Sequence, residues 1–199
     1  MRTIHVIGNG DSAHTFKPAK GLKVTCNLPP FHVDNVWGTV LVDFKMMKAL
    51  TEGSVQIPYT WICGMRPKIW MEKHPSFHMQ HMNHIREFYT ELPKYVANYT
   101  DFNCGHVATH YSCNRLKGEE INMYGFDSIF EFTTRSSTDF VLSSDRGNNN
   151  TARLTNNWRK VWSGIFNEFD KVHFKLHTFN NTPKIELPDN VEVITHSKK

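Results

Sequence analysis

Residues 3–12 read T-I-H-V-I-G-N-G-D-S, a run rich in β-branched residues that leads directly into two glycines. Thr3–Ile7 has the composition of a short strand, and Gly8–Ser12 that of the tight turn after it. Glycines let the backbone approach a ligand closely, the amides that follow can face an anion, and the Ser12 hydroxyl can donate a hydrogen bond. The pattern leaves two alternatives open, a nucleotide or phosphate site and a structural turn.

Neither common phosphate-binding motif completes this stretch. The dinucleotide pattern G-x-G-x-x-G fails at Ala13, and no Gly-Lys-Ser/Thr follows, as a P-loop would require. The type of ligand therefore has to be inferred from the rest of the chain.

The remaining chain alternates between strand-like and helix-like segments. Strands are predicted at Leu22–Cys26, Thr39–Phe44, Tyr59–Cys63, Glu120–Tyr124, Val172–His177 and Val191–Ile194. Helices are predicted over Phe77–Leu92, His106–Lys117 and Thr151–Phe169. This alternation predicts an α/β fold over residues 1–199, a single domain with a Rossmann-like, open, mostly parallel sheet flanked by helices. Residues 52–99 are predicted to be either a helical insertion or a lid.

Open sheets of this kind bind ligands beyond the carboxyl ends of their strands. The candidate site therefore collects Gly8–Ser12, Asn27, Asp43 and Gly125–Asp127. The polar segment Ser143–Asn150 precedes the long helix, and is either a loop over the site or a plain surface connection.

Composition limits the classes of protein to consider. The 199 residues are 39% hydrophobic and 13% aromatic, which favours one folded domain over a disordered chain. The net charge of +4 is small and the basic residues do not cluster, which argues against a nucleic-acid partner. No apolar run is long enough to span a bilayer, and the first ten residues lack the apolar region of a signal peptide, so we expect a cytoplasmic protein.

Two other groups of residues could carry chemistry. The four cysteines are scattered without a C-x-x-C pair, which indicates buried free thiols. His74, His78, His81 and His84 would share one face of a continuous helix. They are interpreted as a solvated or partly buried histidine face, with a transition-metal site at His78, His81 and His84 or a contact with an anionic substrate as alternatives. Trp158 and Trp162 are interpreted as core residues.

The order of these motifs resembles that of bacterial sialyltransferases that use CMP-sialic acid and of the related motility-accessory glycosyltransferases. The family's Gly-Asn-Gly-Pro-Ser loop corresponds to Gly8–Ser12, and its Cys-Asn strand end to Cys26-Asn27. Its Ser-Gly helix start corresponds to Cys104-Gly105, and its Gly-Ile-Asp strand end to Gly125–Asp127. A polar loop, a long helix and a late strand follow in both.

The resemblance implies a nucleotide-sugar donor held at the carboxyl edge of a Rossmann-like sheet. The residues that it assigns to donor binding are Gly8, Asn9, Gly10, Ser12, Asn27, Asp43, Gly105 and Arg146. Asp127 and Asp145 are the candidates for acid–base catalysis. The family needs no metal and no cofactor besides its donor, whose sugar passes to a hydroxyl acceptor.

This chain departs from the family pattern at three places. Ser128, Ile129 and Phe130 stand where the family carries tyrosines that steady the leaving phosphate, and the loop before the long helix holds no histidine base. Asp145 and Arg146 are assigned to that loop by position alone. Asp43 replaces an asparagine, which favours contact with ribose hydroxyls over contact with phosphate. The alternatives are a binding module without catalysis and a metal-dependent enzyme that uses the histidine cluster, and the oligomeric state stays open.

Overall fold

The computed structural model describes residues 1–130, 149–180 and 182–198. They form one eight-stranded, entirely parallel sheet with the order β5-β4-β3-β2-β1-β6-β7-β8. Its strands are β1 (Thr3–Ile7), β2 (Leu22–Cys26), β3 (Val36–Leu41), β4 (Trp61–Cys63), β5 (Ile85–Phe88), β6 (Glu120–Tyr124), β7 (His173–Thr178) and β8 (Val191–Thr195). The predicted single-domain, Rossmann-like α/β fold is confirmed.

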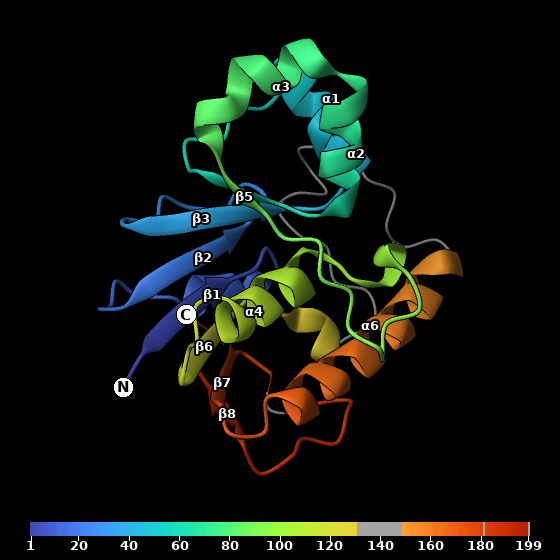
Figure 1. Cartoon of the computed structure of the whole chain (residues 1–199). Helices are drawn as coiled ribbons and strands as arrows, with labels where there is room; N and C mark the ends of the chain where they lie inside the picture. The colour runs from blue at the N-terminus through green and yellow to red at the C-terminus, as the bar shows by residue number, and fades with distance from the viewer. Residues whose placement is uncertain (131–148, 181, 199) are drawn as a thin grey trace.

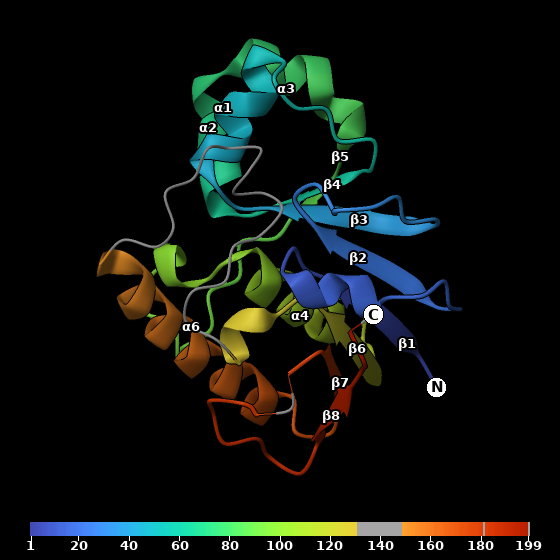
Figure 2. The same cartoon turned by 180° about the vertical axis from the view of Figure 1, so that it is seen from behind.

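Helices cover both faces of this sheet. They are α1 (Phe44–Glu52), α2 (Met65–Lys73), α3 (Pro75–His81), α4 (Cys104–Asn114) and α6 (Asn149–Glu168), together with short 3-10 turns. Figure 1 shows α4 and α6 in front of β1, β6 and β7, whereas α1, α2 and α3 gather beyond β3 and β5. Figure 2 shows the same separation from behind. No helix in the described part of the chain is long and apolar enough to cross a membrane.

The core is divided by the sheet. Adjacent residues of a strand point to opposite faces, so Val40 and Ile62 pack with α4 in the main hydrophobic cluster. Leu41 and Cys63 point the other way and pack beneath α1, α2 and α3 in a second cluster. Trp162, interpreted as a core residue, is buried in the main cluster together with Val161, Ile165 and Phe166, whereas Trp158 is only half-buried.

Two predictions of secondary structure need correction. The helix predicted over Phe77–Leu92 is wrong, because α3 ends at His81, a 3-10 turn follows, and Ile85–Phe88 pairs with β4 as the edge strand β5. The strand predicted over Thr39–Phe44 ends at Leu41, since Phe44 already begins α1. Residues 52–99, predicted as a helical insertion or a lid, carry α2 and α3 but also supply β4 and β5 to the sheet.

Candidate functional site

The direction of chain travel across the sheet reverses beside β1. From β1 the chain runs outward through β2, β3, β4 and β5, and α4 then brings it back to β6 on the other side of β1. The chain therefore leaves the neighbouring carboxyl ends of β1 and β6 toward opposite sides of the sheet, and this is the position where open parallel sheets bind ligands.

The loop after β1 is tied to the loop after β6. The Gly8 amide donates to the Tyr124 carbonyl at 2.6 Å, and the Gly10 amide donates to the Gly125 carbonyl at 3.0 Å. The Asp127 carboxylate accepts the Ser12 amide at 3.0 Å and also accepts the Ser12 hydroxyl. Several of the donors predicted to face a ligand anion are thus engaged within the protein, and Asp127 is itself buried.

The glycines of the loop are explained by this packing. A Cβ on Gly10 would lie 2.2 Å from Oδ2 of Asp127 and 2.8 Å from the carbonyl oxygen of Gly125. A Cβ on Gly8 or on Gly105 would come within 3.1 or 2.5 Å of the Phe126 ring, respectively. The Phe126 ring thus fills the space that both glycines leave, so these two positions serve packing in the structure as it stands.

Three of the predicted site segments meet at the ends of β1 and β2 and the start of α4. The Asn9 amide nitrogen donates to the Cys26 carbonyl at 3.0 Å. Asn27 adopts a left-handed backbone with φ +51°, and its side-chain oxygen lies 3.4 Å from the Cys104 sulfur, which donates to it. Asn9, Asn27 and the Cys104-Gly105 helix start therefore form a continuous line across the carboxyl edge.

The start of α4 is capped from within the chain. Asn103 accepts the His106 amide at 3.0 Å, and the His106 ring accepts the Asn103 amide at 3.1 Å, which completes a capping box. Burial holds the pKa of the Cys104 thiol well above its ordinary value, with a further rise from Asp43 and an opposing effect of Arg66. The first turn of α4 therefore carries a neutral thiol and no acidic side chain.

Asp43 is paired with a residue that the sequence analysis did not single out. Its Oδ1 lies 3.3 Å from Nη2 of Arg66, which stands in the first turn of α2 directly after β4. Both side chains remain partly exposed. The strand-then-glycine pattern that drew attention to residues 3–12 also occurs at Cys63-Gly64, just before Arg66, and could have identified this position.

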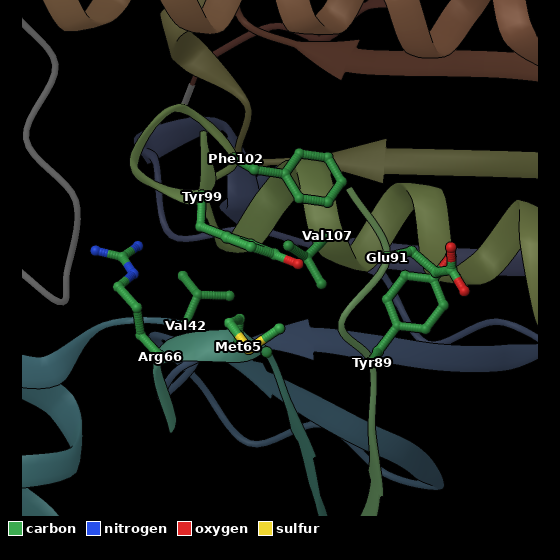
Figure 3. A pocket seen from close by; sticks show the side chains of 9 residues that line it. Val42, Met65, Arg66, Tyr89, Glu91, Tyr99, Phe102 and Val107 are labelled. Atoms are coloured by element: carbon green, nitrogen blue, oxygen red, sulfur yellow. The ribbon is translucent and has the colours of Figure 1, made fainter. Parts of the chain in front are cut away.

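A small pocket opens beside this pair. It is lined by Val42, Gly64, Met65, Arg66, Tyr89, Glu91, Tyr99, Phe102 and Val107. Figure 3 shows Arg66 and Glu91 at opposite ends of the row of lining side chains, with Val42, Met65 and Tyr99 between them. The space open to the centre of a water-sized sphere is about 10 Å³, so the pocket has room for roughly one water. A larger ligand would require movement of the pocket walls.

The Tyr89 hydroxyl is committed to α4 rather than to the pocket. It lies 2.6 Å from Nδ1 of His110 and accepts from the Asn114 amide at 2.9 Å. His110 in turn bonds Glu168 through Nε2 at 3.1 Å. Burial also raises the pKa of Tyr89, so its hydroxyl stays protonated. The Tyr89 ring is thus a wall of the pocket, and its hydroxyl is part of a structural link between the end of β5, α4 and α6.

The histidine cluster does not keep one helical face. His74 precedes α3, whereas His84 lies in the 3-10 turn after it. The Nδ1 atoms of His81 and His84 lie 3.1 Å apart beside Trp61, but the ring of His78 packs edge-on against Phe88. Over residues 1–130, 149–180 and 182–198, no group of three or more histidine, cysteine or acidic side chains is placed to hold a metal.

Two of the predicted site residues, Asp145 and Arg146, lie outside the described residues. The others are all at the carboxyl edge, where Asn9, Asn27 and Gly105 gather around the end of β2 and Asp127 closes the loop after β1. All four cysteines are buried and free, as predicted.

Comparison with known proteins identifies no relative of this chain. No protein-family model, no curated protein and no solved structure matches it.

Proposed function

We propose that the protein binds a nucleotide sugar at the carboxyl edge of its sheet and transfers the sugar to a hydroxyl acceptor, as a glycosyltransferase-like enzyme. The observation that carries the proposal is the line formed by Asn9, Asn27 and the start of α4 beside the point where strand order reverses. In open parallel sheets this edge is the ligand-binding position.

In this proposal each segment has a separate task. The Asn9 and Asn27 amides contact the nucleotide. Approach of the donor to the backbone at Gly105, in the first turn of α4, requires the Phe126 ring that fills this space to move aside. A base removes the proton from the acceptor hydroxyl while donor groups stabilise the departing phosphate. Asp145 stays the predicted base, and Arg146 stays the predicted contact for the phosphate.

A second candidate is a module that binds the same ligand without turnover. The engagement of Asp127 by the Ser12 amide and hydroxyl favours it, because a carboxylate held by two donors is a weak base. The two candidates share a binding site and differ only in chemistry.

Calorimetric titration with CMP, UDP, GDP and ADP, and with their sugars, tests the binding step. We expect one nucleotide to bind. When that nucleotide is present at about 100 times its Kd, it should add about 2.7 kcal/mol to the free energy of unfolding. Asn27→Gly, which tolerates the left-handed backbone, should weaken that binding. Asn35→Gly is the matched control, since Asn35 is also left-handed, at φ +56°, but is exposed.

Release of free nucleotide from the bound nucleotide sugar then separates the enzyme from the binding module. Turnover supports the transferase, and tight binding without release supports the module. Failure of every nucleotide to bind would reject both, and a melting temperature that falls with EDTA would redirect attention to the histidines.

A further inference from the structure

The pocket at the carboxyl edge contains a single cationic side chain. Among its nine lining residues only Arg66 is a lysine or arginine, and Glu91, its one acid, lies at the opposite end. The region around the guanidinium is therefore positive unless another group neutralises it.

Asp43 neutralises Arg66 only loosely. The 3.3 Å separation exceeds the roughly 2.7–2.9 Å of a strong charge-assisted hydrogen bond. A guanidinium has about five N–H donors, and in the described part of the chain this is the one ion pair that Arg66 makes. The Arg66 and Asp43 side chains are 22% and 44% exposed, so water and solutes reach the pair.

The surrounding backbone adds to the positive potential. The helices α1, α2 and α4 all begin at this edge, at Phe44, Met65 and Cys104. Their first turns hold no acidic residue, and each helix start carries a partial positive charge, although Asp43 is itself the N-cap residue of α1 and offsets the charge there. Arg66 lines the same pocket as Val107, which lies in the first turn of α4, so the pair is close to the start of that helix.

We propose that Arg66 binds a phosphoryl group of the ligand, which takes the place of Asp43 as the partner of the guanidinium. The identity of that ligand as a nucleotide rests on the proposed function, whereas the phosphoryl chemistry rests on the partly exposed guanidinium of Arg66 and its long contact with Asp43. A planar guanidinium can hold two oxygens of one phosphoryl group, which gives a stronger contact than the single bond to Asp43.

Asp43 is then a competitor of the ligand and not a contact for its ribose. Replacing the carboxylate by an amide leaves the guanidinium free of its counter-ion, so Asp43→Asn should tighten binding of a phosphoryl group. A ribose contact through Asp43 has the opposite consequence, because its loss weakens nucleotide binding. The sign of the change therefore distinguishes the two roles.

The test is calorimetric titration of the full chain in phosphate-free buffer of low ionic strength, with inorganic pyrophosphate, the four nucleotides and their nucleosides. We expect Arg66→Gln to weaken binding of the phosphorylated ligands by about tenfold or more. Arg66→Lys, which keeps the charge but not the planar fork, should fall between. Arg115→Gln is the matched control, since it removes an arginine that pairs with Glu87 at 3.2 Å near the other end of α4. Circular dichroism and the melting temperature confirm that each variant is folded.

The possible results distinguish the two proposals. Pyrophosphate binding that depends on Arg66 while no nucleotide binds would uphold this inference and reject the proposed function. Nucleotide binding that Arg66→Gln leaves unchanged would overturn the inference and leave the proposed function standing. Weaker pyrophosphate binding by Asp43→Asn would overturn the competition, and no binding of any phosphorylated ligand would overturn both proposals.

Discussion

At the start of α4 the imidazole of His106 uses both of its ring nitrogens inside the protein. Nδ1 accepts the Asn103 amide, and Nε2 donates to the Trp158 carbonyl at 3.1 Å. This arrangement requires the neutral ring, because a proton on Nδ1 would face another N–H donor. Burial lowers the pKa of His106 to about 3, although the hydrogen bond to the Trp158 carbonyl acts in the opposite direction.

This histidine should make the protein sensitive to acid. The unfolded chain takes up a proton here near pH 6.5, whereas the folded protein does so only near pH 3, so stability falls as the pH drops between these values. From about pH 7.5 to about pH 4.5 we expect a loss of about 2–3 kcal/mol from this group. Urea unfolding at both pH values measures it.

His106→Gln should flatten that dependence although it lowers the stability at neutral pH. His177, whose pKa burial and His196 lower to about 4, contributes in the same direction and stays in both proteins. The control is His32→Gln, because that side chain is 74% exposed. An unchanged pH dependence in His106→Gln would contradict the assignment.

The site residues show what a sequence can and cannot supply at this scale. Gly8–Ser12 and Asp127 were both predicted at the carboxyl edge, because each follows a strand with a strong pattern. That Asp127 bonds Ser12 depends on the pairing of β1 with β6, more than a hundred residues apart in the chain, which no local pattern encodes. The pairing of Asp43 with Arg66 depends likewise on β3 lying beside β4.

Among the elements, the carboxyl end of α6 is held by the side chain of Asn190, which follows β7 in the sequence. The amide nitrogen of Asn190 lies 3.1 Å from each of three carbonyl oxygens, those of Phe166, Phe169 and Val172. Carbonyls at a helix end have no partner within the helix. Asn190 therefore closes α6 and fixes the loop before β8 to it.

Substitution at Asn190 should destabilise the protein according to what replaces the amide. Asn190→Ala removes the amide donor from all three carbonyls, of which that of Phe169 still accepts the Val172 amide at 3.0 Å, for a loss of roughly 1–3 kcal/mol. Asn190→Asp should cost more near neutral pH, since a carboxylate then faces three carbonyl oxygens, and should recover partly in acid when the protonated group can donate. Unfolding in urea at two pH values measures both variants.

Asn167→Asp is the control for the added charge, because Asn167 is exposed in the last turn of the same helix. Equal losses at the two positions would show that the charge, and not the three hydrogen bonds, matters at Asn190.

Element prediction worked best where strands are central. β1, β2 and β6 were predicted with the bounds observed, since each is a short run that contains β-branched or other apolar residues and is closed by glycine or asparagine at its carboxyl end. The helix over Phe77–Leu92 was wrong because its apolar spacing also suits a helix, while Ile85–Phe88 becomes a strand only by pairing with β4. An edge strand of this kind depends on a tertiary contact that its own residues do not specify.

For the whole molecule, the division of the core suggests two levels of stability. Cys63 belongs to the cluster under α1, α2 and α3 near one edge of the sheet, whereas Cys26 and Cys104 lie in the main cluster at its centre. All are free thiols, and burial raises the pKa of Cys26 and of Cys63 to about 12. Labelling therefore requires opening of the surrounding structure.

We expect Cys63 to be alkylated faster than Cys104 in urea below the unfolding midpoint, because the outer cluster can open while the central strands stay paired. Mass spectrometry of peptides after timed labelling gives the rate at each cysteine. One common rate for all of them would indicate a single cooperative unit.

The place of β1 in the middle of the sheet has a consequence for synthesis on the ribosome. β1 emerges first, and β2 can join one of its sides after about twenty further residues, but its other partner, Glu120–Tyr124, is made much later. Until then one edge of β1 is a row of unpaired backbone groups next to apolar side chains, a template for pairing with other nascent chains. Slower translation before residue 124 should therefore lower the soluble yield of this protein, and faster translation should raise it.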